Sequence, residues 1–238
     1  MLIKFSIRER LRFLSHAETV KLFQRACVRA GVKIRYSQGF NPRPKLSLPL
    51  PRSVGVETDD DLLCLRVAAC APEQEHLFCE RSAERGLDKR LESPVASFDT
   101  EQFKGRLSEQ LPEGCKLLSV RASGAKTSFQ PISAIYVFEV RQEYLTEMLN
   151  RRIKRLLTSE ILSLKRRYAK NSRLKNVDVR PFLKSIELDD KVITVECKIS
   201  SDGSIRVEEI LRLLELDAEK LAVPIRRTRV QWQENTKS

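Results

Sequence analysis

An α+β fold is predicted by three features of this 238-residue sequence. Short alternating segments typical of β-strands recur along the chain, and segments with apolar residues at three- and four-residue spacing, typical of helices, lie between them. Within each half of the chain these segments follow the order β-α-β-β-α-β. The sequence therefore predicts two tandem ferredoxin-like units with antiparallel sheets, and a single larger sheet built from the same elements is the alternative.

The first unit begins with a strand at 1–8 and continues with a helix whose two ends are both marked. Ser15 and Glu18 form a Ser-x-x-Glu capping box, so the helix is expected to start at about His16. Gly31 ends the helix, because glycine readily takes the positive φ found just past a helix end. Four residues at helical spacing are expected to be buried: Val20, Phe23, Cys27 and Ala30.

A short strand at 32–36 leads into an unusual polar loop. Gly39 permits backbone conformations closed to other residues, whereas Pro42 and Pro44 fix φ, so the loop should be stiff. Its amide, hydroxyl, aromatic and cationic groups form a mixture suited to a nucleotide or phosphate: Tyr36, Ser37, Gln38, Gly39, Phe40, Asn41, Arg43 and Lys45. A polar strand connection without a binding role is the alternative.

The unit boundaries follow from composition. The first unit spans 1–121 and the second 132–238, with a linker at 122–131 that contains Ser123, Gly124, Ser128 and Pro131. A charged helical insertion is expected at about 68–90. The remaining elements of the first unit are strands at 46–50, 61–67, 91–97 and 115–121 and a helix at 99–111.

The second unit repeats this order without a detectable sequence repeat. Its expected elements are strands at 132–140, 161–164, 177–188, 192–199 and 225–232 and helices at 142–158 and 207–214. The first of these helices should bury Leu145, Met148, Leu149, Leu156 and Leu157.

Charge is distributed unevenly along the chain, whose net charge is +12. The net charge is +10 over 1–56, −6 over 57–119, +10 over 120–184 and −2 over 185–238. Two basic blocks separated by an acidic one are expected if each unit contributes one face to a common groove for an anionic ligand. Solvated cations on helix surfaces are the alternative.

The second basic block contains a segment, 165–175, with six basic residues and no acidic one. Such a segment can neutralise phosphates and stack one base, although flexible surface loops share this composition. Arg180, close by, is expected either to contact a phosphate or to pair with Asp178. The candidate binding residues of this block are Lys165, Arg166, Arg167, Tyr168, Lys170, Arg173, Lys175 and Arg180.

His16 is the single candidate catalytic residue. The helix dipole disfavours the protonated form of a histidine in the first turn, which suits it to act as a base or neutral hydrogen-bond donor. Arg10, Arg12 and Tyr36 are expected nearby. A histidine that simply packs against its own helix end is the alternative, and the chain contains no Ser-His-Asp pattern, Walker loop or H-E-x-x-H motif.

Cysteine spacing predicts that the chain holds no metal. Its six cysteines are scattered without a C-x-x-C motif, so no iron–sulfur signature is present. Cys70, His76 and Cys79 are close in sequence, but structural zinc sites nearly always take four ligands. No apolar run approaches the roughly 20 residues that span a bilayer, and the N-terminus lacks the features of a secretory signal. We therefore expect a cytoplasmic protein without a membrane association.

Four segments of the sequence resemble the DUF2344 family, also described as radical SAM-linked proteins. They are LRFLSHAETVKLFQRA, YSQGFNPRPKLSLPLPRSVGVE, VDVRPFLKSIEL and GSIRVEEILRLLEL. Residues 68–90 depart from the family pattern. Members occur beside, or fused behind, radical S-adenosylmethionine enzymes, and no activity is established for them. The resemblance implies that S-adenosylmethionine and an iron–sulfur cluster belong to such a partner, with no cofactor in this chain.

Three functions are consistent with these features. The first is an accessory protein that binds tRNA or ribosomal RNA and presents it to a radical S-adenosylmethionine enzyme for modification. The second is an RNA-processing or RNA-modifying enzyme that uses His16 and the loop 36–45. The third is an adaptor whose basic faces dock the enzyme partner.

Overall fold

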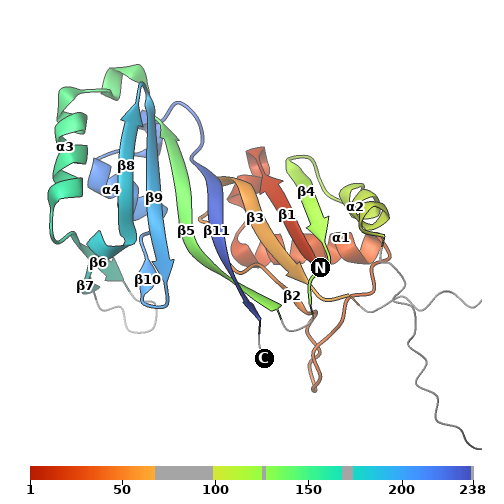
Figure 1. Cartoon of the computed structure of the whole chain (residues 1–238). Coiled ribbons are helices and arrows are strands. Elements are labelled where there is room, and N and C mark those ends of the chain that lie inside the picture. The colour runs from red at the N-terminus through yellow and green to blue at the C-terminus, as the bar shows by residue number, and fades with distance from the viewer. Residues whose placement is uncertain (68–98, 125–126, 168–173, 237–238) are drawn as a thin grey trace, which may run out of the picture.

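The computed structural model describes residues 1–67, 99–124, 127–167 and 174–236, and it has the predicted α+β class. Within these residues, four α-helices accompany a nine-stranded, mostly antiparallel sheet and a separate two-stranded sheet (Figure 1). The expected insertion and the strand after it, 68–97, lie outside the described residues.

Most elements of the first half lie where the sequence places them. They are β1 (Leu2–Ile7), the 3-10 helix η1 (Glu9–Phe13), α1 (His16–Arg29), β2 (Leu46–Ser47), β3 (Glu57–Leu65), α2 (Thr100–Ser108) and β4 (Cys115–Arg121). The capping box is confirmed: Glu18 donates its backbone N–H to Ser15 Oγ, and Ser15 donates its own to Glu18 Oε2 at 2.8 Å. Gly31 follows the helix with φ of 67°, as expected. Phe23, from the buried face of α1, packs edge-on against Phe5 of β1.

The second half contains the remaining elements. They are β5 (Thr127–Glu139), η2 (Gln142–Tyr144), α3 (Glu147–Thr158), β6 (Ser163–Arg167), β7 (Leu174–Asp178), η3 (Arg180–Phe182), β8 (Leu183–Asp189), β9 (Val192–Ser200), β10 (Gly203–Ser204), α4 (Val207–Leu214), η4 (Ala218–Lys220) and β11 (Arg226–Thr236).

Strands of both halves share one sheet, the arrangement that was the alternative. Its order is β10-β9-β5-β11-β3-β1-β4, with β2 beside β3 and β8 beside β9. The last strand, β11, makes the connection between the halves, because it pairs along its length with β5 and also with the start of β3. Only two residue pairs join β11 to β3, Arg226 with Glu57 and Arg227 with Thr58.

One face of the shared sheet is covered by the helices and the other is open. In β3, Leu63 and Leu65 belong to the core under α1 and α2, whereas Leu62 and Cys64 point to the opposite side. Asp61, on the helix side of β3, bonds Arg227, which lies opposite Tyr136 in the core of the second half. The helix-covered sides of the two halves therefore coincide, as Figure 1 shows.

Several predicted boundaries in the first half are wrong. The strand expected at 32–36 is reduced to two isolated bridges, Ile34 with Val67 and Tyr36 with Pro44. The strand expected at 46–50 contains only its first two residues, because the prolines that follow have no N–H to donate. In the expected linker 122–131, the first strand of the second half already begins at Thr127.

Two predictions for the second half also need correction. The helix expected at 142–158 starts at Glu147, and Met148 in its first turn is 70% exposed rather than buried. Ile153, with Leu149 and Leu156, forms the buried stripe instead. The strand expected at 177–188 is interrupted by η3, where Pro181 cannot donate a ladder hydrogen bond.

Candidate functional site

The polar loop between α1 and β2 is a closed hairpin that projects from the lower end of the molecule in Figure 1. Ser37 donates its N–H to the Arg43 carbonyl at 2.8 Å, and Arg43 donates its N–H back to Ser37 Oγ at 2.9 Å. Together with the bridge between Tyr36 and Pro44, these bonds fix both ends of the loop. The stiffness that the sequence predicts is consistent with this geometry.

Aromatic side chains at this loop lie in solvent. Phe40, at the tip, is fully exposed, and Tyr36 is 48% exposed. Gln38, Gly39 and Asn41 around them are exposed as well. A fully exposed phenyl ring gains nothing from burial in the fold, and its face is available for stacking on a ligand.

Three cations stand side by side at the base of the same hairpin. Lys45 donates its backbone N–H to the Arg35 carbonyl, Arg35 donates to Arg66, and Arg66 donates to Lys45, with distances of 2.7–2.9 Å. All three side chains are exposed, as is that of Arg43. No acidic residue occurs between Glu18 and Glu57, and none of these four cations forms an ion pair within the described ranges. We call Lys33, Arg35, Tyr36, Phe40, Arg43, Lys45 and Arg66 the first hairpin cluster.

The second basic segment forms the hairpin of β6 and β7. Lys165 and Arg167 are exposed and share one face of β6, and Lys175 of β7 is exposed too. We call these three residues the second hairpin cluster. The other candidates of this segment, Tyr168, Lys170 and Arg173, lie outside the described residues.

Arg166 and Arg180 have structural roles instead. Arg166 is buried, and its guanidinium donates two hydrogen bonds to Glu209 of α4, at 2.6 and 2.7 Å, and one to the Ser204 carbonyl. Arg180 donates hydrogen bonds to the carbonyls of Leu157, Ser159 and Leu183. The first two carbonyls lie at the C-terminal end of α3, where the helix itself provides no donor for them.

Burial of the Glu209 carboxylate would by itself raise its pKa. The hydrogen bonds from the Arg166 guanidinium and the Arg206 N–H, together with both positive charges, outweigh this effect and leave the pKa of Glu209 below its ordinary value. The β6–β7 hairpin is thereby held against α4 by a charged pair.

Both hairpin clusters lie at the same end of the sheet. β3 is parallel to β11, which is antiparallel to β5, which in turn is antiparallel to β9, so β3 and β9 run in the same direction. The first cluster adjoins Arg66, just past the end of β3. The β6–β7 hairpin is bonded to Ser204 of β10, which follows the end of β9. The two clusters therefore share one end of the sheet, and the common groove expected from the charge pattern stays a prediction.

His16 lies at the opposite end from the loop. It is the first residue of α1, whose 14 residues extend about 20 Å, and the loop follows the other end of that helix. Arg12, three residues before the cap Ser15, donates to the Glu9 carbonyl and lies 4.5 Å above the Phe13 ring, and Arg10 nearby in the sequence is exposed. The expected proximity of His16 to Tyr36 is wrong, because α1 separates them.

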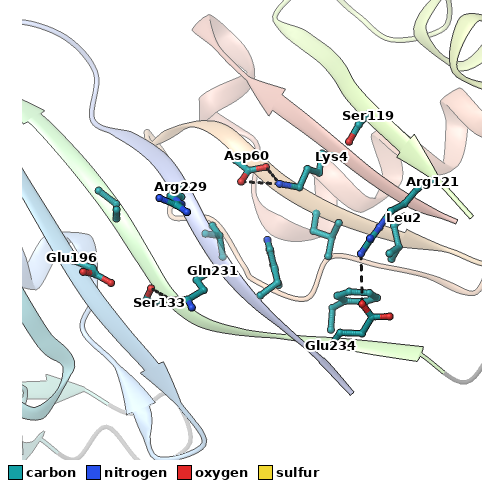
Figure 2. A pocket seen from close by; sticks show the side chains of 15 residues that line it. Leu2, Lys4, Asp60, Ser119, Arg121, Ser133, Glu196, Arg229, Gln231 and Glu234 are labelled. Carbon is teal, nitrogen blue, oxygen red and sulfur yellow. Dashed lines mark hydrogen bonds and ion pairs between the residues drawn. The ribbon is translucent and has the colours of Figure 1, made fainter. Parts of the chain in front are cut away.

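A cavity of about 670 Å³ on the open face was missed by sequence reasoning (Figure 2). It occupies the region where β11 diverges from β3 after their two shared residue pairs. Four apolar side chains pack together beneath it: Leu2, Leu62, Phe129 and Trp232. Because its walls come from six strands, no local sequence signal marks it.

Polar side chains line the cavity in pairs. Lys4 lies 2.8 Å from Asp60, Arg121 lies 3.8 Å from Glu234, and Ser133 Oγ donates to Gln231 Oε1 at 3.3 Å. The side chain of Arg229 is exposed and forms no hydrogen bond or ion pair with another described residue, although the pKa of Glu196 in the same lining is lowered by the hydrogen bond from Lys184 and also by the charge of Arg229. Figure 2 shows the Lys4–Asp60 pair over β1 and β3, and Arg229, Gln231 and Ser133 along the neighbouring strands β11 and β5.

Metal ligands do not gather in the part of the chain that the structure covers. Among those residues, no three His, Cys, Asp or Glu side chains lie close enough to hold an ion. The expected zinc candidates Cys70, His76 and Cys79 lie outside it. Burial raises the pKa of Cys27 to about 11 and the pKa of Cys115 and Cys197 to about 12, so these thiols are poor ligands. No helix in the described ranges has the length and apolarity needed to cross a membrane.

Residues 1–88 and 81–212 match the model of a family described as an uncharacterized protein conserved in bacteria (DUF2344). These matches include both hairpin clusters, while β11 lies beyond them. No curated protein matches the chain.

Proposed function

The chain belongs to the DUF2344 family, and from this membership and the geometry of its basic hairpins we propose that it is an accessory RNA-binding protein. The observation that carries the proposal is the pairing of a fully exposed Phe40 with a row of unpaired cations, at the sheet end that the second hairpin cluster shares.

Each part of the clusters matches a part of RNA. Arg and Lys side chains neutralise phosphates and release condensed counterions. An exposed phenyl ring stacks on any unpaired base, and exposed amides such as Gln38 and Asn41 bond base edges. RNA is favoured over DNA because the hairpins are short loops suited to single-stranded or bulged segments, whereas reading a duplex uses an element that enters the major groove.

We also propose that the two halves are ferredoxin-like units. The strand order β4-β1-β3-β2 of the first half and β11-β5-β9-β8 of the second support this, because each follows the sequence fourth, first, third, second of that fold. The open sheet face of such a unit is a known platform for RNA bases.

The proposed partner is a radical S-adenosylmethionine enzyme, to which this protein presents tRNA or ribosomal RNA. The resemblance of the YSQGFNP and related segments to radical SAM-linked proteins supports this partner. In this proposal S-adenosylmethionine and the iron–sulfur cluster are bound by the partner.

RNA binding is tested by the fluorescence anisotropy of a labelled stem-loop RNA titrated with the protein. Because binding through phosphates releases counterions, the affinity should fall steeply between 50 and 200 mM salt, roughly a hundredfold or more for several phosphate contacts. A variant with Arg35, Lys45 and Arg66 all changed to Gln should bind more weakly and show a shallower salt slope. The matched control changes Arg151, Lys154 and Arg155 of α3 to Gln, and should leave both values unaltered.

Two other functions would be recognised by different results. If the isolated protein processes RNA and His16→Ala abolishes turnover without weakening binding, it is an enzyme, with a site at the end of α1 remote from the loop. If no RNA binds at low salt, while an acidic protein does bind and is lost in the triple variant, the hairpins are adaptor surfaces.

A further inference from the structure

The cavity on the open face has an aromatic side and a polar side. Phe129 and Trp232 belong to the apolar cluster beneath it, and the guanidinium of Arg121 lies 5.8 Å from the centre of the Phe129 ring. The Trp232 indole nitrogen is buried and has no hydrogen-bond partner among the described residues. An aromatic ligand would gain stacking on such a surface, as bases do on aromatic side chains.

The polar side offers donors that the fold leaves unused. Gln231 accepts a hydrogen bond from Ser133 through Oε1, while its amide NH2 group is bonded to no described residue. Arg229 precedes it by two positions on the same strand and faces the same side. Lys4 pairs with Asp60, Arg121 lies 3.8 Å from Glu234, and the remaining lining carboxylate, Glu196, pairs with Lys184. Arg229 is therefore the lining cation without an ion pair among the described residues, and it is available for a ligand's negative charge.

The position of the cavity connects it to the hairpin clusters. It lies on strands between β3, whose end adjoins the first cluster, and β9, whose end leads to the second. A volume of about 670 Å³ is within the range of sites that hold small organic ligands, and a nucleotide is of that class.

We infer that this cavity holds one unpaired nucleotide of the bound RNA, with its base against Trp232 and Phe129, its base edge at the Gln231 amide and its phosphate at Arg229. The inference rests on the proposed RNA binding and deepens it. It gives the sheet face a role distinct from that of the hairpins, which are proposed to contact phosphates and one base at the loop tip.

Trp232 is the one tryptophan in the sequence, so intrinsic fluorescence reports on this cavity. The full chain is titrated with uridine 5′-monophosphate and, separately, with a fluorescein-labelled ten-residue oligouridylate whose anisotropy measures total binding. Both probes should quench Trp232, and Arg229→Gln should weaken the quenching by roughly tenfold, as expected for loss of a charged hydrogen bond. Arg155→Gln, an exposed substitution on α3, is the matched control and should change nothing.

The outcomes separate the two proposals. If the oligonucleotide raises anisotropy but leaves Trp232 fluorescence unchanged, and Arg229→Gln binds it normally, the cavity is not a nucleotide site while RNA binding stands. If the anisotropy of the oligonucleotide stays constant at low salt and neither probe alters Trp232 fluorescence, both proposals are wrong. If Gln231→Ala, a second exposed variant, also weakens quenching by either probe, the assignment of the polar side is supported.

Discussion

The guanidinium of Arg227 bonds both oxygens of Asp61, at 2.7 and 2.8 Å through Nη2, with a further bond of 3.0 Å from Nε to Oδ1. Their side chains are 1% and 8% exposed, and Arg227 also donates to the Pro51 carbonyl. Asp61 belongs to β3 and Arg227 to β11, so a buried charged pair stands where the two halves share a sheet. This ion pair therefore contributes to the stability of the contact between the two halves.

Removing one member of this pair should destabilise the protein strongly. Asp61→Asn leaves a buried guanidinium without its counter-charge, and a loss of about 3–5 kcal/mol in the free energy of unfolding is expected. Urea unfolding followed by circular dichroism measures the loss. The double variant with Asp61→Leu and Arg227→Met should be less destabilised than Asp61→Asn. Equal losses in both would show that the charge pair is not the source of the effect.

Phe40→Ala should weaken RNA binding without altering stability, because the ring is fully exposed and is free to stack on a base. Loss of one base-stacking contact corresponds to about 1–3 kcal/mol, a decrease in affinity of roughly 5- to 150-fold. Anisotropy titration at fixed salt measures it. Phe13, which is 57% exposed at the opposite end of the sheet, provides the control, and Phe13→Ala should bind normally. Similar losses in both variants would point to a nonspecific effect.

Stability should depend on pH through the pair of Arg166 and Glu209. The folded-state pKa of Glu209 is below its ordinary value, so the pair stabilises the protein at pH above about 4.3, and the contribution disappears as pH falls through the folded pKa. The difference in unfolding free energy between wild type and Glu209→Gln should be largest near neutral pH and should narrow below pH 4. A difference that stays constant from pH 7 to pH 3 would contradict this assignment.

Three buried thiols should resist alkylation in the folded protein. With pKa values of about 11 for Cys27 and about 12 for Cys115 and Cys197, roughly one thiol in a thousand or fewer is ionised at pH 8, and the side chains are also out of solvent. Iodoacetamide treatment followed by peptide mass spectrometry should modify them in urea and leave them intact in buffer. Rapid labelling in buffer would reveal frequent local opening.

Short stretches of sequence were sufficient to predict the elements whose structure depends on local interactions. The capping box of α1 and the strand at 115–121 are both found where the sequence predicts them. The conformation of a helix end or an exposed loop depends on residues a few positions away in the sequence. The sequence of such a segment is therefore enough to predict its conformation. The loop 36–45 was singled out for this reason, whereas Lys33, Arg35 and Arg66 of the first hairpin cluster were not, because Arg66 follows the distant strand β3 and only the fold brings it beside Arg35 and Lys45.

Burial of charged residues could not be anticipated from the sequence. Arg166 was expected to bind phosphate along with Arg167, yet it points into the fold because its partner Glu209 lies 43 positions away. Alternation along β6 places neighbouring residues on opposite faces, and only the tertiary position of α4 decides which face is covered. The cavity beside Trp232 depends in the same way on where β11 diverges from β3.

The pairing of β11 with β3 also has a consequence for synthesis on the ribosome. Asp61 and Arg227 are 166 positions apart, which at translation rates of about 5–20 residues per second is a delay of roughly 8–33 seconds. During that interval the edge of β3 that β11 later covers has no lateral neighbour. Asp61 near this edge is without its partner Arg227 during that interval, and its charge keeps the edge hydrated, as charges on open edges do. The nascent chain thus carries its own protection against premature aggregation until its final strand emerges.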